Sequence, residues 1–475
     1  MNMPRRDSAD SLWRTDRRAL TLGLVLTITL VGFEALAVST VMPIAARELG
    51  GIELYGWVFS AFFLGSLIGI VVVGGAIDRG GLALPFAVGL GLFAIGLLAG
   101  GLAPAMLVLV IARFVQGLGA GTIQPIAYVA IGRTLPEALR PRMFATLSTA
   151  WVLPGLIGPA IAGSVGEAFG WRYVFLGLLP LIAVAGALTL GALRAVAPAP
   201  AVADLETARA RRGRLPLAMT VSLGAGLFLI GLTSDQPLAS APLIAVGLAI
   251  GIWALRRLTP AGTLSARPVL PAAVLLRGIL TCAFFGIDAF VALTLVGWRG
   301  LSATEAGIAL TAATVAWTGG AWIQARGARR WPTHSFVRVG FAVAIGGLAG
   351  MLLVLRPEIP WPAGVVAFGV AGLGMGLAYS PLALIVLREA PADRQGASTS
   401  ALSLTDSLGT ALGTGITGAF VAASVRMTGE PAAGLAVGFI VAVVIGLGGL
   451  LLTGRLRPRA AQAGVLALSS ASPPS

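Results

Sequence analysis

Charged residues and metal-binding residues are both scarce in this sequence. Only 11% of its 475 residues are charged, against about 25% in soluble domains, and 57% are hydrophobic. The single cysteine, Cys282, excludes an internal disulfide and a cysteine metal cluster, and the single histidine, His334, excludes a polyhistidine site. With no nucleophile elbow and no P-loop, the sequence predicts neither an enzyme nor a bound metal or cofactor.

Long apolar runs recur along the chain from Ala19 to Leu456, and the mean hydropathy is +0.92. A run of about 18 or more apolar residues crosses the hydrocarbon layer of a bilayer as a helix, so we predict an all-α polytopic membrane protein. The fourteen candidate spans lie near residues 20–43, 54–77, 83–103, 105–132, 143–166, 173–194, 215–234, 238–255, 275–296, 303–325, 336–355, 363–387, 398–424 and 433–454. We interpret 215–234 and 238–255 as two spans, because each is long enough to cross and their outer flanks are basic.

The basic residues, all of them arginine, are distributed unevenly between the two sides that these spans define. The breaks and tails on the side of the N-terminus hold 27 arginines, the opposite breaks hold five, and Arg113 is counted within a span. The positive-inside rule therefore places both chain ends in the cytoplasm. This distribution also accounts for the net charge of +14 without a nucleic-acid partner.

Two acidic residues, Glu34 and Asp288, interrupt long apolar runs. A carboxylate at the centre of a membrane helix costs about 2.5–3.5 kcal/mol on insertion scales, so such a residue generally has a function. The alternative for each is a structural acid, held in the case of Glu34 by a hydrogen bond or by Arg113. Arg113 itself is expected to be buried and paired, and whether it relays protons or only holds a carboxylate stays open.

An internal repeat relates the two halves of the chain. Glu34 and Asp288 are separated by 254 residues, and the Gly-x-Gly-x-Gly segments 117–121 and 372–376 by 255. We interpret these glycines as helix-packing positions, since no strand precedes them and no lysine follows. Asp406 has no acidic counterpart in the first half, where Trp151 occupies the equivalent position. Its role, functional or a polar contact between helices, stays open.

The repeat predicts six spans, a two-span insert and six related spans, arranged as two halves related by pseudo-two-fold symmetry. Such parallel halves carry the substrate site at the midplane between them, so Glu34 and Asp288 are expected to face each other across a central cavity. The predicted regions are a cytoplasmic tail (1–18), an N-terminal half (19–196), a cytoplasmic linker with two extra helices (197–268), a C-terminal half (269–456) and a disordered cytoplasmic tail (457–475).

Four motifs resemble those of the fourteen-helix drug:proton antiporters of the major facilitator superfamily. In the first span, Glu34 precedes Pro43 by nine residues, although Leu36 and Ser39 replace the usual threonine and asparagine. The fourth span carries Arg113-Phe-Val-Gln-Gly117, which resembles the motif assigned to proton transfer.

The other two motifs concern conformational change. The loop after the second span resembles the superfamily's signature loop, but lacks its closing basic residues; its matching positions are Gly74, Asp78, Arg79 and Gly81. The fifth span resembles the antiporter motif, which uptake members generally lack; its positions are Gly155, Gly158, Pro159 and Gly163. These glycines allow close helix approach, and the proline removes a backbone hydrogen bond.

The resemblance implies proton-coupled export of lipophilic, mainly cationic, drugs or toxic compounds by alternating access. Glu34 and Asp288 would bind protons and substrate in turn, with Asp406 and Arg113 in the same coupling path. The partners implied are the small-molecule substrate, protons and the lipid bilayer, and the expected form is a monomer in a bacterial inner membrane. Two alternatives stay open: export of a lipid or an endogenous metabolite, and proton-coupled uptake.

Overall fold

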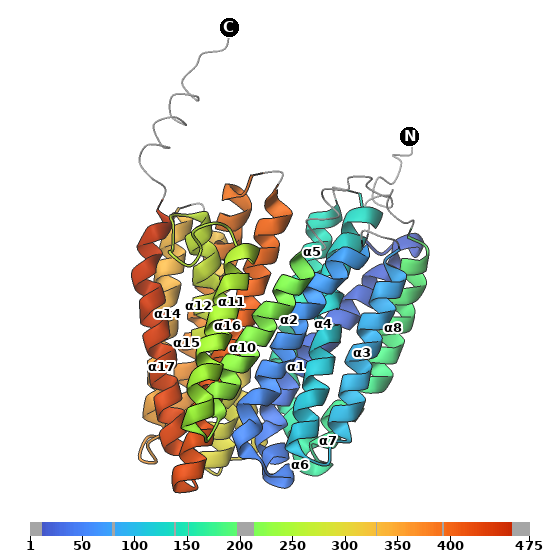
Figure 1. The fold of residues 1–475 in the computed structure, drawn as a ribbon. Coiled ribbons are helices and arrows are strands. Elements are labelled where there is room, and N and C mark those ends of the chain that lie inside the picture. Colours follow the sequence, from blue (N-terminus) through green and yellow to red (C-terminus); the bar gives the residue numbers. More distant parts are fainter. Residues whose placement is uncertain are drawn as a thin grey trace, which may run out of the picture.

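The computed structural model describes residues 12–77, 81–136, 139–150, 152–196, 213–328, 330–391 and 394–457. Every regular element in these ranges is helical. The long helices run side by side between two opposite faces of one bundle (Figure 1). The prediction of an all-α membrane fold is confirmed.

The helices fall into three consecutive sets. The first contains α1 (Thr15–Leu49), α2 (Tyr55–Ile77), α3 (Ala83–Gly101), α4 (Met106–Thr134), α5 (Arg140–Thr149), α6 (Val152–Ala168), α7 (Arg172–Leu176) and α8 (Leu178–Arg194). The second is a hairpin of α10 (Arg214–Thr233) and α11 (Pro237–Leu258). The third contains α12 (Leu270–Ala292), α13 (Ala303–Gly327), α14 (Thr333–Val354), α15 (Pro362–Glu389), α16 (Gln395–Thr428) and α17 (Ala432–Leu452).

Most of these helices have the dimensions of membrane spans. In the described part of the chain, 13 helices are long and apolar enough to cross a bilayer, and both helices of the α10–α11 hairpin are among them. Helix α6 is shorter, with 17 residues, and follows α5 after residue 151, which lies outside the described ranges. The count of fourteen spans and the cytoplasmic position of both ends stay predictions.

Glycines allow the helices of each set to approach closely. In α4, Gly117 and Gly121 lie against the backbone of α2. In α15, Gly372 and Gly376 lie against the backbone of α13 in the same way, while Gly374 lies against α14. Within a bilayer, where water offers no hydrophobic drive between helices, association depends on such close packing. The interpretation of the two glycine segments as packing positions is confirmed, and their matching neighbours support the repeat.

The first and third sets meet mainly along two pairs of helices, α2 with α16 and α6 with α13, and α1 also contacts α12 and α13. At Gly56 and Gly418, the backbones of α2 and α16 are in direct contact. Gly163 of α6 lies against the first residues of α13, Ala303 and Thr304. Both contacts occur at the face where α1 ends and α2 begins, opposite to the chain ends.

The α10–α11 hairpin lies beside the α2–α16 contact. Helix α10 contacts both α2 and α16, whereas α11 packs mainly against α10. The Ser222 hydroxyl donates to the Leu64 carbonyl at 3.2 Å, and Asp235 forms a 2.6 Å ion pair with Arg426 of α16. The hairpin therefore touches both larger sets at one side of the bundle. The proposed division into two six-helix halves and an insert rests on the repeat and stays a proposal.

We expect Gly374→Leu to destabilise the protein, because a side chain at this position would meet the backbone of α14 at Gly340 and Ala344. Inserting bulk into a packed interior costs about 1–3 kcal/mol. The measurement is the thermal unfolding of the purified protein in detergent. The matched control is Gly346→Leu on α14, where the added side chain meets open space. An unchanged unfolding temperature for Gly374→Leu would contradict the observed packing.

Candidate functional site

Glu34 and Arg113 form an ion pair in the interior of the first helix set. Glu34 lies on α1 and is 0% exposed, and Arg113 lies on α4 and is 2% exposed. Nη1 of Arg113 contacts Oε1 of Glu34 and donates to Oε1 of Gln116 at 2.6 Å. The guanidinium carbon lies 4.3 Å from the ring centroid of Phe62. The pair joins α1 to α4. Either charge, if buried here without the other, would destabilise the protein.

The Glu34 carboxylate is only partly satisfied by this arrangement. Its second oxygen, Oε2, is buried and has no hydrogen-bond partner among the described residues, and the same holds for Nε2 of Gln116. A buried polar atom without a partner costs free energy, and such atoms in native structures mark a bound water, strain or a chemical role. An added proton on Oε2 would turn this oxygen into a donor and reduce the buried negative charge.

Asp288, the repeat partner of Glu34, has a different environment. It lies on α12 and is partly exposed, and it makes neither a hydrogen bond nor an ion pair with any residue in the described ranges. The Tyr55 hydroxyl interacts with it electrostatically and is itself buried without a hydrogen-bond partner in those ranges. The ring of Tyr55 packs on Phe290, two residues after Asp288 on α12, at 5.3 Å between centroids. Asp288 is thus an acid without a fixed counter-charge.

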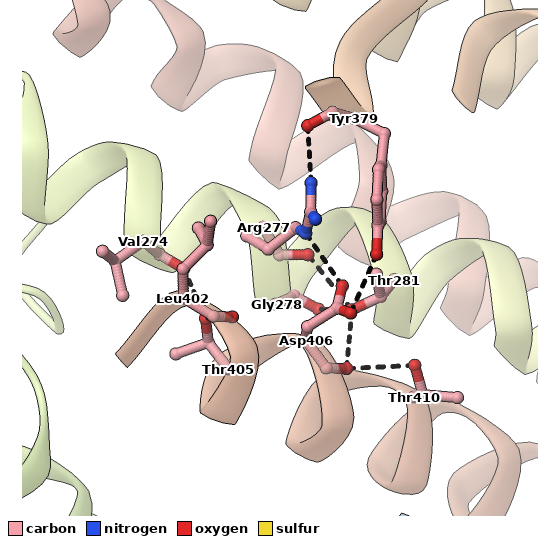
Figure 2. Close-up of polar contacts among 9 residues, drawn as sticks. All are labelled: Val274, Arg277, Gly278, Thr281, Tyr379, Leu402, Thr405, Asp406 and Thr410. Atoms are coloured by element: carbon pink, nitrogen blue, oxygen red, sulfur yellow. Dashed lines mark hydrogen bonds and ion pairs between the residues drawn. The ribbon is translucent and has the colours of Figure 1, made fainter. Parts of the chain in front are cut away.

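A second buried arginine–carboxylate pair joins Arg277 on α12 to Asp406 on α16 (Figure 2). Nε of Arg277 donates to Oδ1 of Asp406 at 2.9 Å, and the Tyr379 hydroxyl donates to Oδ2 at 3.0 Å. Nη1 of Arg277 also donates to the Tyr379 carbonyl at 2.5 Å, and its guanidinium covers the tyrosine ring. The Asp406 side chain is 27% exposed, so this cluster borders open space while the Glu34 pair does not.

The sequence analysis placed Asp406 among the candidates but missed its partners. Arg277 lies two turns into α12, but only two residues inside the predicted span, close to the arginines that mark the span ends. The structure buries it, with 6% of its surface exposed. An arginine inside the apolar window 275–296 was the signal available in the sequence. Nothing in the sequence indicated that Arg277 pairs with Asp406, which lies 129 residues further along the chain.

The antiporter-like motif on α6 lies where the first and third helix sets meet. Gly155 contacts Thr314, and the Pro159 carbonyl contacts Gly307, both on α13, whereas Gly158 faces the Phe33 ring of α1. The interface ends in a polar contact: Glu167 of α6 accepts hydrogen bonds from the Ala303 amide at 2.6 Å and from the amide and hydroxyl of Thr304 at 3.2 and 3.1 Å. The motif therefore borders a helix interface that must change if the two sets move.

The loop-like motif can be located only in part. Gly74 lies in the last turn of α2, and Gly81 lies two residues before the start of α3. Asp78 and Arg79, the charged members of the motif, lie outside the described residues. The Glu34–Arg113 pair thus lies within the first helix set and the Asp406 cluster within the third, whereas the α6 motif lies between the two sets. Asp288 lies on α12, and the roles of all these residues stay proposals.

A helical bundle with paired buried charges and glycine-lined helix interfaces has the construction of a membrane transporter. Comparison with known families identifies which one. The family model described as "Major Facilitator Superfamily" matches residues 24–414, and the chain belongs to this superfamily. It is accordingly a multi-pass membrane transporter and not an enzyme.

Two curated relatives come from Mycobacterium tuberculosis. The chain is 28% identical to "Multidrug resistance protein Stp" over 426 residues, which cover 86% of this chain and 76% of that protein. It is 25% identical to "Drug efflux pump JefA" over 430 residues, covering 86% of this chain and 81% of the other.

Solved structures share the fold. A POT family transporter in complex with 5-aminolevulinic acid gives a TM-score of 0.66 at 17% identity, covering 92% of this chain and 96% of the other. A D-xylose-proton symporter gives 0.65 at 15% identity, covering 93% of this chain and 98% of the other. At these identities the likeness concerns the fold alone.

We expect Arg113→Met to lower the free energy of unfolding by about 3–5 kcal/mol, because it leaves the Glu34 charge buried without its partner. The second change Glu34→Gln should then restore part of the lost stability. The measurement is thermal unfolding of the single and double variants in detergent.

The control is Arg172→Met, which breaks the ion pair with Glu48 at the end of α1. The side chains of that pair are 34% and 51% exposed, so its loss should cost at most about 1 kcal/mol. Equal losses for Arg113→Met and Arg172→Met, or no recovery in the double variant, would refute the structural importance of the buried pair.

Proposed function

We propose that this transporter exports lipophilic, mainly cationic, compounds in exchange for protons, across the inner membrane of a bacterium and as a monomer. The names of the relatives, a multidrug resistance protein and a drug efflux pump, support export of drug-like molecules. The antiporter-like residues Gly155, Gly158, Pro159 and Gly163 favour export over uptake.

The proposal of proton coupling rests on the contacts of the Glu34 carboxylate. One carboxylate oxygen is neutralised by Arg113, and the other is buried without a described hydrogen-bond partner. A proton on this second oxygen would weaken the attraction to Arg113 and release the guanidinium toward Gln116 and the Val58 carbonyl, which it already contacts. Protonation at Glu34 would thereby change how firmly α1 is held to α4.

Asp288 supplies the preference for cations. A partly buried carboxylate without a fixed counter-charge is stabilised when it is neutralised from outside, either by a proton or by a positively charged ligand. Because both would neutralise the same group, they exclude each other, and this competition couples their opposite movements.

Alternating access would occur by rocking of the two proposed halves, 19–196 and 269–456, about this region. The contacts between α2 and α16 and between α6 and α13 close the face opposite to the chain ends. With the predicted orientation, this is the outer face, so the bundle would be closed toward the outside in this conformation. The Arg277–Asp406–Tyr379 cluster, which is part of the third helix set, is proposed to respond to protonation from that side.

We expect Glu34→Gln to abolish proton-coupled export while leaving the protein in the membrane. The assay is accumulation of a fluorescent lipophilic cation in efflux-deficient bacteria, with and without a protonophore. The wild type should keep accumulation low until the protonophore is added, and Glu34→Gln should accumulate the dye in both conditions.

The matched control is Glu48→Gln, which removes another α1 carboxylate paired with an arginine, but at an exposed position. It should export normally. Full export by Glu34→Gln would overturn the assignment of this residue to proton coupling. Equal accumulation in cells with and without the wild-type protein, at normal expression, would instead favour a lipid or an endogenous metabolite as the substrate. Substrate uptake that a proton gradient drives inward would favour a symporter.

A further inference from the structure

A pocket lies between the two helices of the α10–α11 hairpin, at the end nearest the chain termini. It has a volume of about 470 Å³ and is formed by the first turns of α10 and the last turns of α11. Arg214, Thr220, Trp253 and Arg257 supply its polar and aromatic surface. None of the described residues that line it is acidic. The volume falls within the range of small-molecule sites, about 300–1,000 Å³.

The charge and geometry of this pocket suit a phosphate group. Arg214 comes from α10 and Arg257 from α11, so two guanidinium groups on different helices border one cavity. Guanidinium groups bind phosphate oxygens through paired hydrogen bonds. Arg257 is held over the ring of Trp253, with its guanidinium carbon 4.4 Å from the ring centroid, and this contact keeps the charge at the pocket rim.

The remaining surface of α11 is suited to acyl chains. The helix packs mainly against α10, and its other side exposes large apolar residues toward the surroundings of the bundle. Trp253, which lines the pocket, is 49% exposed, and Ile252 and Leu248, which precede it on α11, are 40% and 43% exposed. Tryptophan and arginine at a helix end are typical of the headgroup level of a bilayer. A ligand with a phosphate and acyl chains would fill the pocket and cover this surface at once.

We propose that the pocket between α10 and α11 binds the phosphate of an acidic phospholipid between Arg214 and Arg257, with the acyl chains along α11. Helix α10 also contacts α2 and α16, so the bound lipid stabilises the hairpin at the place where the hairpin touches both larger helix sets. This site is separate from Glu34, Asp288 and Asp406, and it does not depend on the transported substrate.

The test is native mass spectrometry of the purified full-length protein with phosphatidylglycerol, compared with phosphatidylcholine of the same acyl chains. The wild type should bind phosphatidylglycerol more tightly. Because one arginine near the lipid surface contributes about 1 kcal/mol, Arg214→Gln and Arg257→Gln should each weaken this binding about fivefold. Arg257→Lys, which keeps the charge, should retain most of it.

The chain offers a matched control in Arg256→Gln. This arginine precedes Arg257 and is also exposed, but it does not line the pocket. Its removal should leave binding almost unchanged. Equal weakening by Arg256→Gln and Arg257→Gln would overturn the proposal in favour of general surface charge, as would equal binding of the two lipids. Displacement of the lipid by an excess of inorganic phosphate would assign the site to free phosphate instead. Thermal unfolding of each variant identifies any variant that fails to fold. Lipid binding by the variants that do fold then decides whether the proposal holds.

Discussion

The whole structure depends on the cost of placing charge in a medium that hydrates it poorly. Each fully buried charge described above is held by an opposite charge on a different helix, as Glu34 of α1 is by Arg113 of α4. Arg277 of α12 and Asp406 of α16 follow the same rule. Because breaking such a pair strands a charge, each pair fixes two helices of one set against each other. The buried charges of these pairs are therefore cross-links within each set.

The contacts between the two larger helix sets have a different character. At Gly56 and Gly418 backbone meets backbone without any side chain, and nearby the hydroxyls of Ser60 and Thr414 lie 2.9 Å apart. If the two helices separate, each of these hydroxyls can donate a hydrogen bond to a carbonyl of its own helix, as the Thr414 hydroxyl already does to the Thr410 carbonyl. Separating these surfaces therefore leaves no buried charge without its partner. We infer that the bundle is firm within each set and separable between them, which is the distribution that alternating access requires.

The sequence allowed the spans to be predicted well and the contacts poorly. The window 433–454 lies within two residues of α17 (Ala432–Leu452) at both ends, because the length of an apolar run follows directly from the thickness of the bilayer. Glu34 and Asp406 could be recognised because an acid in such a run is expensive. The partner of Asp406 could not, since Arg277 lies near a helix end where arginines are common. The packing of α10 against α2 and α16 could not be predicted either, because the sequence of a helix that is apolar on all sides does not indicate which face it buries.

The repeat itself is imperfect in a way that separates the roles of its two acids. The offset that aligns Gly117 with Gly372 also aligns Arg113 with Phe368. Phe368 is fully buried and stacks on Phe284 at 5.4 Å, so the position that supplies the cation for Glu34 supplies only apolar surface in the second half. The arginine of that half, Arg277, is instead paired with Asp406. Symmetry thus brings Glu34 and Asp288 to equivalent positions, but only Glu34 has a fixed counter-charge. For the exchange of protons for cations that we propose, this difference would assign the cationic ligand to Asp288, because an acid already neutralised by the protein has no need of one.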